Sequence, residues 1–265
     1  MVEETFILEG KKLRKEFGSL VAVADVDIRV RAGELHAIIG PNGAGKTTLF
    51  NLLSGHLRPT GGTVWFQGRD ITAEPLHRRV HLGIGRSFQI TNIFPSLTVL
   101  ENVRLAAQAL GGDSFKFWWN FRRFTQYTET ALTAIAQMGL SDKLGVPAAA
   151  LPHGDQRKLE LAILLASDAE LLLLDEPTAG MAAEQVPPLM ETIRAIQRST
   201  GKTIMLVEHN MNVVMTSSDR ITVMHLGAVL AEGTPAEITR NETVQQAYLG
   251  ELYGDFAGII GGGST

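Results

Sequence analysis

The chain contains no cysteine, so neither disulfide bonds nor thiolate metal ligands contribute to its structure or chemistry. It also lacks an excess of basic residues: 24 Lys and Arg stand against 28 Asp and Glu, which gives a formal net charge of −4. Proteins that bind nucleic acid usually carry a net basic surface, so this balance disfavours nucleic acid as a partner.

Long hydrophobic runs are absent as well. The longest, "LAILLA" and "LLLL", are far too short to cross a bilayer, and the N-terminus "MVEETFILEG" is acidic where a secretory signal is basic. We therefore expect a soluble, cytoplasmic protein. With 265 residues and 45% apolar content, the chain is large enough to bury a sizeable core.

The order of the expected elements indicates an α/β fold with a helical insertion. Strand patterns fill most of the first forty residues and return at "LLLLDE", "TIMLVE" and the hairpin "RITVMHLGAVLAEG". Helical composition dominates between them, from about 91 to 166. We expect one domain with its catalytic core at about 1–90 and 167–250, a helical subdomain at about 91–166, and a C-terminal tail at 251–265.

Several local features are also predicted. They are a bulge at Asp25, a helix from Lys46 to Leu57, a strand in "GTVWFQGRDI", a capping box of Thr98 and Glu101, a helix from about Gln126, and a C-terminal helix that begins at Pro235.

A phosphate-binding loop is the strongest motif in the chain. The phosphate loop, "GPNGAGKT" at residues 40–47, matches G-x-x-x-x-G-K-[ST] and lies between an expected strand and an expected helix. Its glycines allow backbone N–H groups to point at phosphate oxygens, and the helix adds the positive end of its dipole. Lys46 would reach the β- and γ-phosphates of ATP, and the Thr47 hydroxyl would bind Mg²⁺. The predicted nucleotide-binding residues here are Gly40, Pro41, Asn42, Gly43, Ala44, Gly45, Lys46, Thr47 and Thr48.

An acidic strand end complements this loop. "LLLLDE" is an apolar run typical of a strand buried on both faces, and it ends in Asp175 and Glu176. In a nucleotide-hydrolysing site Asp175 would hold Mg²⁺ and Glu176 would polarise the attacking water. The alternative, in which both carboxylates only cap the following turn, is weak beside a phosphate loop. The residues alone thus predict a Mg²⁺-dependent ATPase.

With these motifs, the chain resembles the ATPase subunits of ABC transporters over nearly its whole length. The resemblance implies a P-loop NTPase core with a mostly parallel sheet, an antiparallel N-terminal β-subdomain and an inserted helical subdomain. In "KEFG", "RSFQ" and "LVEH" it assigns Phe17 to stacking on adenine, Gln89 to sensing Mg²⁺ and the transport subunit, and His209 to contacting the γ-phosphate.

The resemblance also implies partners. Such a subunit pairs with a second ATPase subunit, binds transmembrane permease subunits at the inner face of the cell membrane, and is served indirectly by a substrate-binding protein. No nucleic acid partner is implied.

The signature turn, "LPHGDQ" at residues 151–156, departs from the family pattern Leu-Ser-Gly-Gly-Gln. In the family this turn caps the ATP held by the other subunit, and here only Leu151 and Gly154 match. Pro152 replaces the serine that usually donates to the γ-phosphate, and proline has no N–H to substitute. Asp155 adds a negative charge near the anion site.

A second departure falls on Ala182, which takes the place of the family's D-loop aspartate. Together the departures favour a heterodimer over a homodimer. In that heterodimer the site on this chain's own loop is complete, and Glu176 carries most of the hydrolysis.

The transported substrate is indicated by longer stretches. "GIGRSFQITNIFPSLTVLENV" and "AYLGE" look most like ATPases that power uptake of branched-chain amino acids and related polar compounds. "YLGE" also resembles lipopolysaccharide-transport ATPases, which leaves a lipid exporter as an alternative. An ATPase acting on nucleic acid is disfavoured, because the chain has one phosphate loop and no heptad repeat.

An aromatic segment, "FKFWWNFRRF" at residues 115–124, holds two of the three tryptophans beside three cationic residues. Docking onto a partner or membrane surface and internal packing with the cations turned outward are equally favoured interpretations. Stacking on single-stranded nucleic acid is the disfavoured one.

Overall fold

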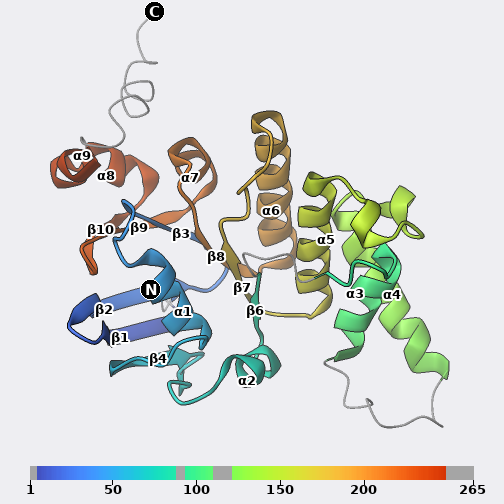
Figure 1. The fold of residues 1–265 in the computed structure, drawn as a ribbon, viewed down its shortest axis with the longest axis horizontal. Helices are drawn as coiled ribbons and strands as arrows, with labels where there is room; N and C mark the ends of the chain where they lie inside the picture. Colours follow the sequence, from blue (N-terminus) through green and yellow to red (C-terminus); the bar gives the residue numbers. More distant parts are fainter. Residues whose placement is uncertain (1–4, 88–92, 110–120, 249–265) are drawn as a thin grey trace, which may run out of the picture. The chain divides into compact units, whose positions relative to one another are not determined.

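The computed structural model describes residues 5–87, 93–109 and 121–248, without the side chains of residues 121–124 and 248 (Figure 1). Gln89 and most of the aromatic segment therefore lie outside the described residues. Backbone contacts divide the chain into two compact units, one formed by residues 1–76 and 203–265 and the other by residues 77–202. The finer division into a catalytic core and a helical subdomain stays a prediction.

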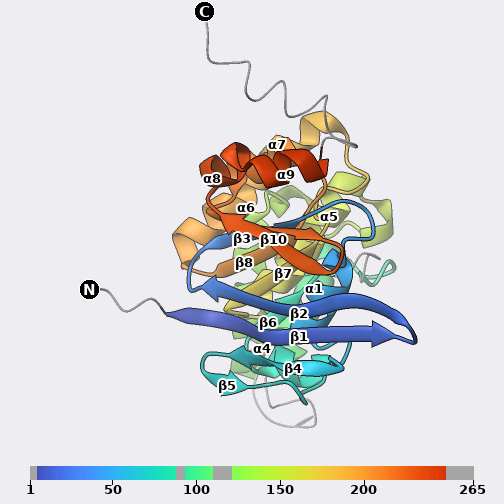
Figure 2. The same cartoon turned by 90° about the vertical axis from the view of Figure 1, so that its left-hand side faces the viewer.

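The described strands of the first unit form two groups. The antiparallel N-terminal sheet has the order β2-β1-β4-β5, with strands at Phe6–Phe17 (β1), Leu20–Arg31 (β2), Gly61–Phe66 (β4) and Arg69–Asp70 (β5). The second group has the order β10-β9-β3-β8, with strands at Leu35–Ile39 (β3), Thr203–Val207 (β8), Arg220–His225 (β9) and Ala228–Gly233 (β10). Figure 2 shows β1 and β2 side by side, with β4 along β1.

The strands of the second group surround β3. This strand runs parallel to both β8 and β9, and only β10 is antiparallel, to β9. All five residues of β3 and all five of β8 are buried. The carboxyl ends of β3 and β8 therefore emerge side by side, in the arrangement where α/β folds place their ligands.

Alternating polarity explains the N-terminal sheet. In β2, every second residue from Val26 to Val30 is buried while the residues between them face solvent. The predicted bulge at Asp25 is confirmed, because the β1–β2 register shifts opposite Leu13 and Lys15 and Asp25 takes a φ of 50°.

Two local predictions in this unit are wrong, and glycine explains both. The segment predicted as a single strand is a hairpin, because Gln67 and Gly68 adopt φ values of 50° and 75° and reverse the chain between β4 and β5. The helix after the phosphate loop, α1 (Lys46–Ser54), does not reach Leu57, because Gly55 takes the left-handed conformation and ends it.

The remaining helices of the first unit follow β8. They are α7 (Met211–Ser217), α8 (Pro235–Arg240) and α9 (Glu242–Tyr248). The prediction that Pro235 opens a helix is confirmed, and a capping box of Thr234 and Glu237 fixes its start. The predicted hairpin turn at Gly227 is also confirmed, between β9 and β10.

The second unit combines two parallel strands with helices. Its described strands and α-helices are α2 (Leu76–His81), which begins at the boundary, β6 (Ile84–Arg86), α3 (Val99–Ala109), α4 (Phe121–Gln137), α5 (His153–Ala166), β7 (Leu171–Asp175) and α6 (Val186–Thr200). β6 pairs with β7, every residue of β7 is buried as predicted, and α3, α4 and α5 pack against one another (Figure 1).

Helix starts in this unit can be compared with their predictions. The capping box is confirmed: the Thr98 N–H donates to Glu101 Oε2 at 2.9 Å, and the Glu101 N–H donates to Thr98 Oγ1 at 3.2 Å. Helix α4 begins at Phe121, earlier than the predicted Gln126. Across the described ranges, no helix combines the length and the apolar character needed to span a bilayer.

Candidate functional site

The phosphate loop joins β3 to α1 in the first unit, and two of its glycines are required by close backbone contacts. A Cβ at Gly40 would overlap the carbonyl oxygen of Met224 in β9, and a Cβ at Gly45 would overlap that of Ala22 in β2. The Gly227 N–H also donates to the carbonyl oxygen of Ala44 at 3.0 Å. The loop is thus held between β2 and the β9–β10 turn, which fixes its shape without a ligand.

Inside the loop, Lys46 is only 5% exposed. Its Nζ donates to the carbonyl oxygens of Gly40 at 2.6 Å and Pro41 at 3.0 Å. Thr47, the next residue, is exposed in the first turn of α1. The first N–H groups of a helix have no intrahelical acceptor, and Gly45 at the N-cap offers no side chain to cap them. The loop therefore presents a cation, a hydroxyl and a helix N-terminus, a combination suited to a polyphosphate.

Two other predicted residues belong to the first unit and are accessible. Phe17 ends β1 and is 48% exposed, and Lys15 Nζ lies 5.1 Å from the centre of its ring. His209 follows β8 and is exposed, and its N–H donates to Glu208 Oε2 at 3.2 Å. An exposed aromatic residue and an exposed histidine thus lie in the same unit as the phosphate loop.

Asp175 lies in the second unit, at the carboxyl end of β7, and is only 4% exposed. Its Oδ2 accepts a hydrogen bond from Arg86 Nη2 at 3.3 Å, and its N–H donates to Ser87 Oγ at 3.0 Å. Burial lowers the pKa of Arg86, and the attraction of Asp175 opposes that change. A buried carboxylate with a cationic neighbour is thus built into this strand end.

Glu176 follows in the left-handed region, with a φ of 47°, and is half-buried. This conformation is costly for a residue with a Cβ, and such strain concentrates at functional sites. The Ala179 N–H donates to the Glu176 carbonyl oxygen at 3.0 Å, which closes the turn. The turn redirects the chain immediately after Asp175, so the two carboxylates do not simply alternate across a strand.

The signature turn leads into α5 in the second unit. Pro152 is the N-cap, with an extended backbone (φ −56°, ψ 152°) and no side-chain cap. Leu151 is 5% exposed, and Gly154 is buried; a Cβ at position 154 would come within 2.9 Å of Gln185 Oε1, so that side chain would have to shift. The two residues that match the family pattern are therefore also the packed ones.

The charge of Asp155 is paired. Lys143 Nζ donates to its Oδ2 at 2.5 Å, and Lys158 Nζ lies 3.7 Å from its Oδ1. The hydrogen bond to Asp155 raises the pKa of Lys143. The negative charge expected to oppose an anion at this turn is thus offset by two lysines, both of them outside the motif.

Of the predicted site residues, the phosphate loop, Phe17 and His209 lie in the first unit, and the two carboxylates and the signature turn lie in the second. Sequence reasoning missed Arg86, Ser87 and Lys143. A signal was present for the first two, because they are the first two residues of the "RSFQ" motif that contains Gln89, at the end of the strand paired with the acidic one. Lys143 gave none, because nothing in the sequence places it beside Asp155.

Comparisons with known protein families show two matches, which cover separate parts of the chain. The model of the family described as "ABC transporter" matches residues 23–179, and the model described as "Branched-chain amino acid ATP-binding cassette transporter" matches residues 228–253. The high-affinity branched-chain amino acid transport ATP-binding protein LivG of Salmonella typhimurium is 40% identical, over 92% of this chain and 98% of that protein.

More distant relatives were also found. The lipopolysaccharide export system ATP-binding protein LptB of Acidithiobacillus ferridurans is 33% identical, over 93% of this chain and 98% of that protein. Among solved structures, the ADP conformation of MJ1267, an ATP-binding cassette of an ABC transporter, is similar with a TM-score of 0.81 and 30% identity. That match covers 93% of this chain and 99% of the other.

Proposed function

The chain belongs to the ABC transporter family of ATP-binding proteins, and we propose that its hydrolysis of ATP powers the import of branched-chain amino acids or related polar compounds. The observation that carries this proposal is the similarity to LivG along nearly the full length of both chains. The second family match, over residues 228–253, supports the same substrate class.

The chemistry is assigned to residues of both units. Lys46 exchanges the loop carbonyls for the β- and γ-phosphates of ATP, and Phe17 supplies a stacking surface for the adenine. Glu176 orients the attacking water, and His209 contacts the γ-phosphate. The Thr47 hydroxyl and the buried Asp175 carboxylate are the oxygen donors that suit Mg²⁺, which neutralises phosphate charge when bound.

The proposed assembly is a heterodimer of ATPase subunits that sits at the inner face of the cell membrane through permease subunits, with a substrate-binding protein delivering the cargo. This chain brings a complete phosphate loop, but its signature turn offers Pro152 instead of a hydroxyl donor. Because the lysine contacts offset Asp155, the lost hydroxyl is the larger defect that the partner's ATP would meet.

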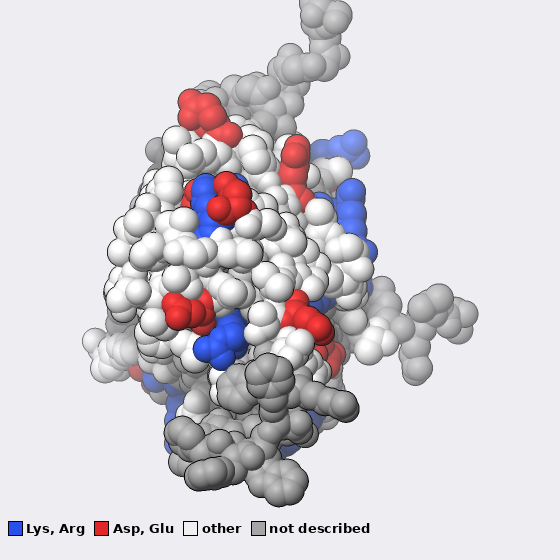
Figure 3. All heavy atoms as spheres, turned by 90° about the vertical axis from the view of Figure 1, so that its right-hand side faces the viewer, with Lys and Arg blue, Asp and Glu red and all other residues white. Residues whose placement is uncertain are grey.

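Lipid export is the second candidate, supported by the similarity to LptB. Nucleic acid is not favoured by the part of the surface in Figure 3 either: in the centre of that face, the described Lys and Arg side chains lie beside Asp and Glu and form no continuous basic patch.

The test is purification of the tagged full-length chain from membranes of its own cells, followed by identification of the bound subunits. We expect a pair of permeases and a second ATPase subunit. Reconstituted with them, the complex should take up labelled leucine in an ATP-dependent manner, with a Lys46→Ala complex as the inactive control. Recovery with lipid-transport components, or ATPase stimulation by lipopolysaccharide and not by amino acid, would overturn import in favour of export.

A further inference from the structure

Two consecutive residues at the end of β6 hold Asp175 from both sides. The Arg86 guanidinium donates to the side chain at 3.3 Å, and the Ser87 hydroxyl accepts the backbone N–H at 3.0 Å. The Ser87 N–H donates in turn to the carbonyl oxygen of Leu173 at 2.8 Å, which continues the pairing of β6 with β7 past the last strand residue. Asp175 is therefore fixed relative to the β6 end by backbone and side-chain contacts together.

The ion pair between Arg86 and Asp175 is deeply buried. The two side chains are 7% and 4% exposed. Water screens a pair little at this depth, and a buried charge that loses its partner is strongly unfavourable. A guanidinium also has a planar, rigid set of donors, so it constrains the orientation of a carboxylate more than an ammonium does.

We propose that Arg86 is a positioning residue for the magnesium-binding carboxylate, because it fixes Asp175 before the cation arrives. The inference rests on the proposed function, since it takes Asp175 as a Mg²⁺ ligand. Residues that orient a metal ligand without touching the metal govern metal affinity, typically by about 10–100-fold. Arg86 therefore acts on the Mg²⁺-dependent part of nucleotide binding and not on the part that the phosphate loop supplies.

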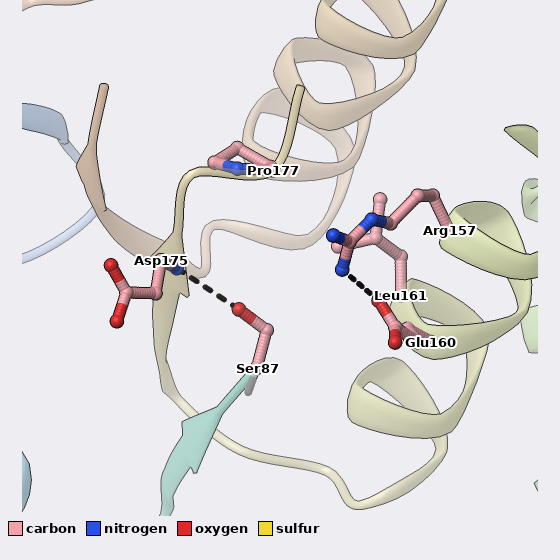
Figure 4. Close-up of a pocket in the computed structure, with 6 residues that line it drawn as sticks. All are labelled: Ser87, Arg157, Glu160, Leu161, Asp175 and Pro177. Carbon is pink, nitrogen blue, oxygen red and sulfur yellow. Dashed lines mark hydrogen bonds and ion pairs between the residues drawn. The ribbon is translucent and has the colours of Figure 1, made fainter. Parts of the chain in front are cut away.

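A matched control lies near the same strand end. Arg157 Nη1 donates to Glu160 Oε2 at 2.8 Å, and these side chains are 11% and 10% exposed. Both line a small cavity with Ser87, Asp175 and Pro177, but the Asp175 carboxylate points away from them (Figure 4). Breaking the Arg157–Glu160 pair thus removes a buried ion pair from the same unit and leaves the support of Asp175 in place.

The experiment measures equilibrium binding of a fluorescent ATP analogue to the full-length chain, in EDTA and across a Mg²⁺ titration. Arg86→Met should raise the Mg²⁺ concentration at the midpoint by about tenfold or more, with binding in EDTA unchanged. Arg86→Lys should shift the midpoint in the same direction but less. Lysine keeps the positive charge but lacks the planar set of donors that orients the carboxylate. Arg157→Met should lower the unfolding temperature without moving the midpoint.

An unchanged or lowered midpoint in Arg86→Met would overturn the proposal. So would an equal rise in Arg157→Met, because the effect would then be one of general stability. If thermal unfolding shows that Arg86→Met is not folded, Arg86→Lys decides alone: a raised midpoint supports the proposal and an unchanged one overturns it. Failure of the wild-type chain to bind the analogue at all would contradict the proposed function and not this inference.

Discussion

The phosphate loop and the signature turn are both helix N-termini that this family uses to bind ATP, yet their glycines are constrained by different neighbours. Around the loop, glycine is enforced by neighbouring backbone: a Cβ at Gly40 or Gly45 would overlap a carbonyl oxygen of another strand. Around the turn, the Cβ of a residue at position 154 would meet the Gln185 side chain. Backbone in a sheet cannot move aside, whereas the end of a glutamine side chain can.

This difference explains why one motif matches its pattern fully and the other does not. The loop has to keep its residues to keep its shape, with Lys46 already held inside it by two carbonyl oxygens. The turn keeps its helix start with a proline at the N-cap, and two lysines balance its aspartate. We infer that the loop is intolerant of change and that the turn adapts through side chains nearby.

The largest effect is expected from Lys46→Ala. Removing the ammonium leaves the charge of the β- and γ-phosphates without its partner in the loop, so ATP affinity should fall by about 100-fold or more and turnover should be lost. Isothermal titration and a phosphate-release assay measure the two quantities. Lys12→Ala, an exposed lysine paired with Asp27, is the control and should match the wild type. Near-normal hydrolysis by Lys46→Ala would contradict the inference that the phosphate loop is the less tolerant of the two motifs.

Glu176→Gln separates hydrolysis from binding at the complete site. The amide keeps the size of the side chain but cannot polarise water as a carboxylate does, so the rate should fall by about 100-fold or more. ATP binding should persist, and gel filtration with ATP and the partner ATPase subunit should show a trapped heterodimer that the wild type does not accumulate. Glu184→Gln, in the exposed turn before α6, serves as the control. Wild-type turnover by Glu176→Gln would remove it from this role.

The loop and the strands around it could be predicted from sequence because their determinants are local. Glycines, the lysine and the apolar strands lie within a few residues of one another, and each residue type has one physical role there. The hairpin at Gln67 and Gly68 was missed because two positive φ values decide it, and the strand pattern on either side is continuous. The support of Asp155 by Lys143 could not be predicted, because it depends on how the segment before the turn folds back.

Replacing glycine by alanine tests the comparison through stability. Gly40→Ala should destabilise the chain by about 1–3 kcal/mol, because the methyl group would meet the backbone of β9. Gly154→Ala should change stability by less than about 1 kcal/mol, because alanine favours the helix while Gln185 has to shift. Urea unfolding of both variants, compared with the wild type, gives the two values. Equal losses would show that the turn is as constrained as the loop.

The smallest effect, and the one most specific to the turn, is expected at Lys143. The hydrogen bond to Asp155 raises the pKa of Lys143, so the stability from this ion pair is fully present at neutral pH and is lost only as the pH rises through that raised pKa. Lys143→Ala leaves Asp155 with Lys158 as its remaining ionic partner at 3.7 Å, and the carboxylate then faces the partner subunit's ATP with less compensation. In the assembled transporter this should slow ATP turnover by about two- to fivefold, and low salt should enlarge the difference.

Asp155→Asn added to Lys143→Ala should restore the rate, because the charge that needed a counter-ion is gone. A double variant as slow as Lys143→Ala would mean that the lysine supports the turn by packing, and that Asp155 is tolerated for a reason other than its charge balance.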